Sequence, residues 1–194
     1  MKRTYLSIDL DYWLAPDDHY VDYNNPTIEQ FHTFMRSLDF IKDRCIVDSH
    51  DHILSHINNI APKKIIHVDY HQDIAYPYDI YKNVTLHEGT FFYFVENRNK
   101  IDYIWYYPDK KSLDFGLCVL PSAKPFSKKN FIFKNQNRSK GLPTNDVLKD
   151  VVALGFSIST DYLDTITKDE LIKLLIPYFK LQDIEAALSE NNII

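Results

Sequence analysis

The feature that most constrains the fold of this chain is a set of continuously apolar, strand-length segments that alternate with segments of helical periodicity. They include residues 6–10, Lys64–Val68 and the stretch VVALGFSIS, which begins at Val151. Strands that are apolar on both faces are typical of a parallel sheet covered by helices on both sides. The sequence therefore predicts an α/β fold with three layers, a mostly parallel sheet between helices, formed by one domain over residues 1–194.

Shorter patterns predict the remaining elements. Thr167 and Glu170 form a capping box, which indicates a helix that carries Leu171, Leu174 and Leu175. In chain order, the other expected elements are a helix from Pro26 that buries Ile28, Phe31, Met35 and Leu38, a strand at 45–47 that turns into a helix running to about Asn59, a helix at 91–97, and strands at Asp102–Tyr107 and 115–120. Residues 122–145 are expected to be polar and irregular, apart from a short strand in FIF.

Composition and charge exclude several classes of protein. The net charge of −5 provides no basic field for nucleic acid, and the four glycines form no phosphate-binding motif. No segment approaches the roughly 20 apolar residues that span a bilayer, so no membrane partner is expected. The opening MKRTYLSIDLDYW has no apolar core of a signal peptide, and Cys45 and Cys118 resemble reduced core residues. We therefore expect a cytoplasmic protein.

Acidic and histidine side chains follow the apolar segments. Asp69, His71 and Asp73 come at alternate positions after Val68. On an extended segment such residues share one face, where they repel one another unless a cation lies among them. A polar turn with acids that cap a helix is the plainer interpretation of one such motif. SIDLDYW repeats the spacing with Asp9 and Asp11 at a second strand end, which favours a metal site.

A third strand end adds a histidine, because VDSHDHIL offers His50 and His52, of which we expect one to reach the metal. The five earlier groups and one such histidine give six donors, mostly carboxylates. This set favours manganese over zinc and suits a pair of ions about 3.5–4 Å apart. His67 lies deeper in its strand. It is interpreted as a core histidine, or as one that contacts the metal ligands, rather than as a ligand itself.

Two further residues are ambiguous from the residues alone. His87, in VTLHEGTFF, reads as an exposed loop histidine, and Asp161 follows the apolar strand that begins at Val151 and reads as a turn residue.

Taken together, these motifs resemble those of the arginase and ureohydrolase superfamily. In that superfamily D-x-H-x-D and S-x-D-x-D bind a two-manganese cluster, although here SIDLDYW comes first, so the motif order is permuted. The chain is most similar to a family of short arginase-like proteins with the motifs V-x-x-H-x-x-x-L, H-x-D-x-H-x-D and I-W-x-x-P. Its matches are Val47, His50 and Leu54, then residues 67–73, then YIWYYP. This family includes peptide arginases, which convert arginine to ornithine within ribosomally made precursor peptides.

The resemblance implies a role for each matching residue in an arginase-like domain. It favours His50 over His52 and gives the metal ligands Asp9, Asp11, His50, Asp69, His71 and Asp73 for two Mn²⁺ ions. His87 lies where arginases carry a histidine that shuttles protons, and would protonate the leaving amine. Asp161 matches an acid that pairs with the guanidinium group, with Glu88 as the next candidate.

The expected function is therefore hydrolysis of guanidinium groups, which converts peptidyl arginine to ornithine and releases urea. Two alternatives remain open at this stage. One is an agmatinase-like or deacetylase-like enzyme that acts on a small amidino or amide substrate. The other is a metal-binding interaction module without turnover, which docks a partner through its aromatic surface.

Overall fold

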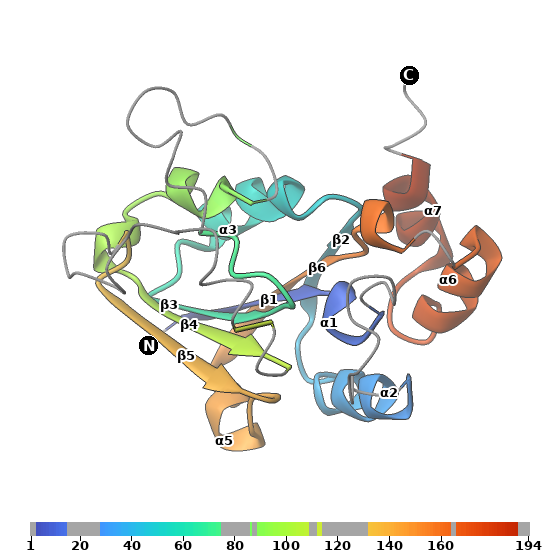
Figure 1. Cartoon of the computed structure of the whole chain (residues 1–194), viewed down its shortest axis with the longest axis horizontal. Coiled ribbons are helices and arrows are strands. Elements are labelled where there is room, and N and C mark those ends of the chain that lie inside the picture. The colour runs from blue at the N-terminus through green and yellow to red at the C-terminus, as the bar shows by residue number, and fades with distance from the viewer. Residues whose placement is uncertain are drawn as a thin grey trace.

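The centre of the molecule is a parallel sheet. The computed structural model describes residues 3–14, 28–74, 86, 89–108, 112–113, 132–163 and 166–189. Within these residues six strands form one sheet in the order β2-β6-β1-β3-β4-β5, and every neighbouring pair is parallel (Figure 1). The strands are β1 (Thr4–Asp9), β2 (Asp43–Val47), β3 (Lys64–Val68), β4 (Asp102–Tyr107), β5 (Asn135–Lys140) and β6 (Val151–Ser157).

Helices lie between these strands and after β6. The α-helices are α1 (Asp11–Leu14), α2 (Ile28–Ser37), α3 (Leu54–Ile60), α5 (Asn145–Leu148), α6 (Lys168–Leu175) and α7 (Leu181–Ser189). The 3-10 helices are η2 (His50–Ile53), η3 (Phe91–Phe94), η4 (Arg98–Lys100) and η6 (Thr160–Tyr162). The capping box predicted from Thr167 and Glu170 is present at the start of α6.

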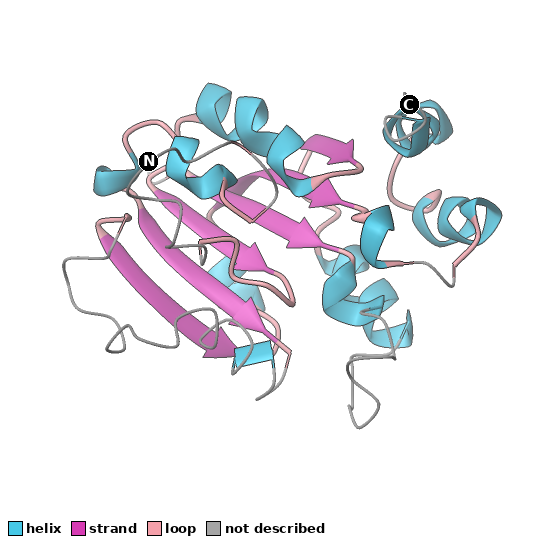
Figure 2. Ribbon diagram, turned by 45° about the horizontal axis from the view of Figure 1, so that its top comes forward, coloured by secondary structure: helices cyan, strands magenta, loops and turns pink. Residues whose placement is uncertain are grey.

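The two faces of the sheet carry separate cores. On one face Leu6 and Ile8 of β1 pack with Phe31 of α2 and with residues of α1, α6 and α7. On the other face Tyr5 packs with Ile57 of α3 and with η3. Figures 1 and 2 show α3 on one side of the sheet and α1 and α2 on the other. The predicted three-layer α/β fold with a parallel sheet is confirmed.

The strand order places a topological switch point beside β1. After β1 the chain passes through α1 and α2 to β2 on one side, whereas after β3 it continues to β4 on the other side. Neighbouring strands whose connections leave in opposite directions form a switch point, where ligands bind beyond the carboxyl ends of the strands. The end of β1 at Asp9 and the residues after Val68 lie at this switch point.

Strand β5 lies in a segment that was expected to be irregular, so this expectation is wrong. Residues 122–145 were expected to be irregular apart from a strand in FIF, but the strand is β5, and residues 132–134 form bends. Strand β5 is an edge strand with no apolar side chain, so neither apolar runs nor alternation reveals it. Its backbone pairs with β4, and Asn135 Nδ2 donates to Asp102 Oδ1 at 2.7 Å.

Other expected elements differ in extent or lie elsewhere. The helix expected at 91–97 is the short η3, and the helix expected to run to Asn59 consists of η2 followed by α3. The strand expected at 115–120, with Cys118, and the helix start at Pro26 lie outside the described residues.

Candidate metal centre

The carboxyl ends of β1, β2 and β3 bring the predicted donors together. Asp9 is the last residue of β1, and Asp11 is the first residue of α1. His50 begins η2 just after β2, and Asp69 follows β3 directly. Because β1 pairs with β3 and is separated from β2 only by β6, these ends lie along one edge of the sheet.

His50 is the centre of an inner group of donors. Its Nδ1 lies 3.1 Å from Asp9 Oδ2, 3.1 Å from Asp69 Oδ2 and 3.0 Å from Asp73 Oδ2. All four residues are buried, with at most 7% of their surface exposed. His67 joins this group, since its Nε2 lies 3.1 Å from Asp69 Oδ2. The His50, His67, Asp69 and Asp73 side chains can hold a metal ion.

A second group of donors lies beside the first and shares Asp69. His71 Nδ1 lies 2.8 Å from Asp11 Oδ2 and 3.9 Å from Asp69 Oδ1. Asp11, Asp69 and His71 also have the arrangement of a metal site. The His71 side chain is 25% exposed, whereas those of Asp11 and Asp69 are each 1% exposed. The second group is therefore the one nearer to solvent.

Several of these donor atoms are buried without a hydrogen bond. Among the described residues, His50 Nδ1, Asp11 Oδ2, Asp69 Oδ2 and Asp73 Oδ2 are inaccessible to solvent and have no hydrogen-bond partner. Buried polar atoms in proteins are nearly always paired, and unpaired buried charges are costly. Atoms that approach within about 3 Å of one another without hydrogen-bond geometry suit a cation between them. The donor set thus fits a metal ion.

Without a metal, protons offset the charge of the carboxylates. Burial and the neighbouring Asp69 raise the pKa of Asp11 and of Asp73 well above the usual range. Burial disfavours the charged form of His71, but Asp11 outweighs it and raises the pKa of His71 to about 10. Burial likewise opposes protonation of His50, yet Asp69, Asp73 and Asp9 raise its pKa well above the usual range.

Asp69 differs from the other buried acids. Burial disfavours its charged form, but the rings of His67 and His50 hold its pKa well below the usual range. Asp69 therefore stays ionised, and its carboxylate belongs to both donor groups.

The backbone conformation that brings the donors together is not the one that the alternating pattern predicts. Strand β3 ends at Val68, and the following residues form bends in which Asp73 has a φ of 52°. Asp69 Oδ1 accepts a hydrogen bond from the His71 backbone N–H at 2.6 Å, and Asp11 Oδ1 accepts from the Tyr70 N–H at 3.3 Å. The expectation of an extended segment is wrong, because the second oxygens of the acids hold a turn.

The histidines near the centre differ in burial. His50 is buried at the centre and His52 is exposed, which matches the preference for His50. His67 is fully buried, as expected of a core histidine, but it was not expected to be a ligand, and it lies among the side chains that could hold a metal ion.

Of the three residues expected to act on the substrate, the structure describes only Asp161. Asp161 is an exposed residue of η6, at the end of β6. His87 and Glu88 lie outside the described residues. The roles of all three remain predictions.

Hydroxyl groups that the sequence pattern does not reveal hold Asp9 and Asp48 in place. Ser159 Oγ donates to Asp9 Oδ2 at 2.5 Å and lies 2.9 Å from Ser157 Oγ. Asp48, which is buried, accepts from the N–H and the Oγ1 of Thr160 at 3.1 and 2.9 Å. Ser159 has a φ of 53°, so a backbone in the left-handed region brings its hydroxyl to Asp9. No periodic signal predicts that conformation.

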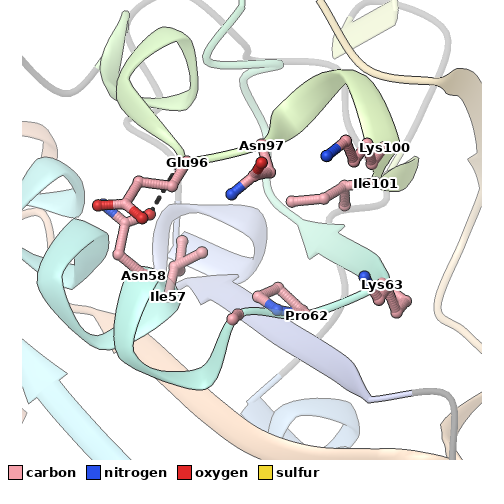
Figure 3. Close-up of a pocket in the computed structure, with 9 residues that line it drawn as sticks. Ile57, Asn58, Pro62, Lys63, Glu96, Asn97, Lys100 and Ile101 are labelled. Carbon is pink, nitrogen blue, oxygen red and sulfur yellow. Dashed lines mark hydrogen bonds between the residues drawn. The ribbon is translucent and has the colours of Figure 1, made fainter.

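A separate pocket lies at the opposite ends of the strands. Its volume is about 200 Å³, and Figure 3 shows its lining, which includes Asn58 and Lys63 before β3 and Glu96 and Lys100 before β4. Within it the Glu96 N–H donates to Asn58 Oδ1 at 2.9 Å. Among the described residues its lining includes no histidine and one acid, Glu96, so it is distinct from the metal centre.

No family model, curated protein or solved structure matches this chain. The likeness to arginases therefore consists of the short motifs alone. In the described part of the chain, no helix has the length and apolar character needed to span a membrane.

Proposed function

We propose that this protein is a hydrolase with two Mn²⁺ ions that acts on guanidinium groups, converting peptidyl arginine to ornithine and urea. The observation that carries the proposal is the pair of donor groups that share Asp69 at the switch point of a parallel sheet. The guanidinium substrate and its peptide context come from the motif resemblance.

The charge of the centre supports two divalent ions. Asp9, Asp11, Asp69 and Asp73 provide four buried carboxylates, and two divalent cations offset that charge. Oxygen donors with one or two imidazoles favour manganese over zinc. Asp69 belongs to both donor groups and would help to hold both ions, with His50 in the inner group and His71 in the outer group.

The metal ions and the residues around the centre have separate roles in the proposed reaction. Two bound ions would lower the pKa of water enough to supply hydroxide near neutral pH. Asp161 pairs with the guanidinium cation, which the metal ions would otherwise repel. His87 gives a proton to the leaving amine as the C–N bond breaks, so that water and the guanidinium group become urea and the ornithine amine. The partial exposure of His71 supports approach of the substrate from the outer donor group.

The experiment is mass spectrometry of arginine-containing peptides treated with manganese-loaded protein. The expected signal is loss of CH₂N₂ from each converted arginine, together with one urea. Free arginine and agmatine serve as competing substrates, and the Asp69→Asn variant serves as the inactive control. Urea from agmatine but not from peptides would support the small-molecule alternative. Tight metal binding without urea from any guanidine would support the interaction module instead.

A further inference from the structure

Ser7 lies between two buried histidine rings of the metal centre. Its Oγ is 2.8 Å from His50 Nε2 and 3.3 Å from His67 Nδ1. Ser7 and His67 are paired residues of β1 and β3, and all three side chains are at most 1% exposed. The position is closed to bulk solvent, and the hydroxyl is within hydrogen-bond distance of both rings.

A serine hydroxyl has one proton, so Ser7 can donate to only one of the two ring nitrogens. A neutral imidazole carries hydrogen on one nitrogen and a lone pair on the other. The protons of the two rings are therefore coupled through Ser7. If Ser7 donates to one ring, it can only accept from the other.

The second nitrogen of His67 decides the direction. His67 Nε2 lies 3.2 Å from the backbone oxygen of His71 and 3.1 Å from Asp69 Oδ2. A carbonyl oxygen and an ionised carboxylate only accept, so His67 Nε2 must carry hydrogen and donate to the His71 carbonyl. The neutral ring then has its lone pair on Nδ1, which accepts from Ser7.

This direction fixes the tautomer of His50. Because the Ser7 proton points to His67, His50 Nε2 must donate to Ser7 Oγ. The lone pair of neutral His50 is then on Nδ1, the atom that faces Asp9, Asp69 and Asp73. A metal ion suits that position, as does a proton in the metal-free protein, since three carboxylate oxygens surround it.

We propose that Ser7 is a positioning residue that fixes complementary tautomers, making His50 a metal ligand through Nδ1 and His67 a hydrogen-bond donor rather than a ligand. The His67 N–H holds the turn that carries Asp69, His71 and Asp73. The inference rests on the metal centre of the proposed function but not on its reaction.

The alternative is that both histidines bind the metal. His67 would then direct the lone pair of Nε2 at the metal, beside the His71 carbonyl oxygen at 3.2 Å. Both remaining N–H groups would point at Ser7 Oγ, whose proton would serve neither ring. The two arrangements differ in which nitrogen of His67 carries hydrogen, and this is measurable.

The test is NMR of ¹⁵N-histidine-labelled protein, both metal-free and loaded with Zn²⁺ as a diamagnetic probe. The expected pattern is hydrogen on His67 Nε2 in both states and zinc on His50 Nδ1 in the loaded state. In Ser7→Ala, His67 should show a mixture of tautomers, and zinc affinity should fall about 10–100-fold. Thr4→Val removes a hydroxyl from a buried residue at the other end of β1 and should change neither result.

A second pair of variants keeps the test decisive if Ser7→Ala does not fold. His67→Gln retains an N–H donor for the His71 carbonyl and should bind zinc within about 10-fold of wild type, whereas His50→Gln should lose far more affinity. Zinc-shifted His67 Nε2, or equal losses in the two Gln variants, would overturn the inference. Absence of urea with these tautomers intact would overturn only the proposed reaction.

Discussion

At the scale of single residues, Asp69 is the side chain on which the centre depends most. One oxygen lies near His50 and His67, and the other accepts from the His71 N–H. Trp105 Nε1 donates to the Asp69 carbonyl at 2.9 Å, which fixes the backbone at the end of β3. The motif made Asp69 predictable, but its partners Trp105 of β4 and His50 of η2 come from other elements, which no local spacing reveals.

Asp161→Asn tests the partner of the guanidinium group. The variant keeps the shape and removes the charge, so it should retain both metals and lose most activity on arginine peptides, since a charge-assisted hydrogen bond contributes about 1.5–3 kcal/mol. Metal content and urea release are measured together. Loss of metal would show that the strand before Asp161 supplies a ligand. Retention of both would return Asp161 to a turn residue, with Glu88 to be tested next.

His87→Ala tests proton transfer to the leaving amine. We expect lower turnover with unchanged metal content, because the proposed role of His87 begins only when the C–N bond breaks. The measurement is urea release at saturating peptide, alongside elemental analysis. Wild-type turnover would leave His87 as an exposed loop histidine.

The stability of the metal-free protein should depend on pH through His71. Its pKa is about 10 in the folded protein and about 6.5 when unfolded, so its contribution is complete below about pH 6.5 and is lost as pH rises to about 10. The raised pKa values of Asp11 and Asp73 act in the same direction. Urea unfolding of chelator-treated protein should show a falling free energy of unfolding across this range. A flat profile, or the same fall in His71→Gln, would contradict the assignment.

At the scale of elements, the sheet determines what can be predicted. The strands β1, β3 and β6 can be predicted from their apolar composition. The donors can then be located, because they come directly after strand ends. Composition does not predict the polar edge strand β5 or the hydroxyls of Ser157 and Ser159, because their positions depend on pairing with distant strands. Ser7 is an intermediate case: it shares a face with Asp9 by alternation, but its two histidine partners come from other elements.

Gly155 of β6 makes room for a buried tyrosine of β1. A Cβ atom at this position would meet Tyr5 Oη at 2.2 Å, and that hydroxyl lies 2.9 Å from His56 Nδ1. Gly155→Ala should therefore lower the free energy of unfolding by about 1–3 kcal/mol, as overpacking does. Urea unfolding measures the loss. Tyr5→Phe removes the clashing oxygen, so the double variant should lose less than the sum of the single variants; strict additivity would refute the steric account.

At the scale of the whole molecule, the fold and the site are linked by the switch point between β1 and β3. Carboxylates that arrive from β1 and β3 meet there because the two strands are neighbours, although 60 positions separate the Ser7 and His67 that pair in the sheet. The sequence predicted the class of fold, and its six candidate donors lie at strand ends that share one edge of the sheet, but it set aside His67, which lies among the inner donors. It could not predict the turn geometry or the hydrogen bonds, since these depend on which strands become neighbours.

The number of manganese ions bound per chain tests the central claim most directly. Protein loaded with Mn²⁺ and freed of excess metal by gel filtration is analysed for manganese against protein concentration. Two donor groups that share one carboxylate predict two ions per chain in the wild type, and loss of both in Asp69→Asn, which removes the shared charge. A single ion per chain, or an Asp69→Asn variant that keeps two, would contradict the account.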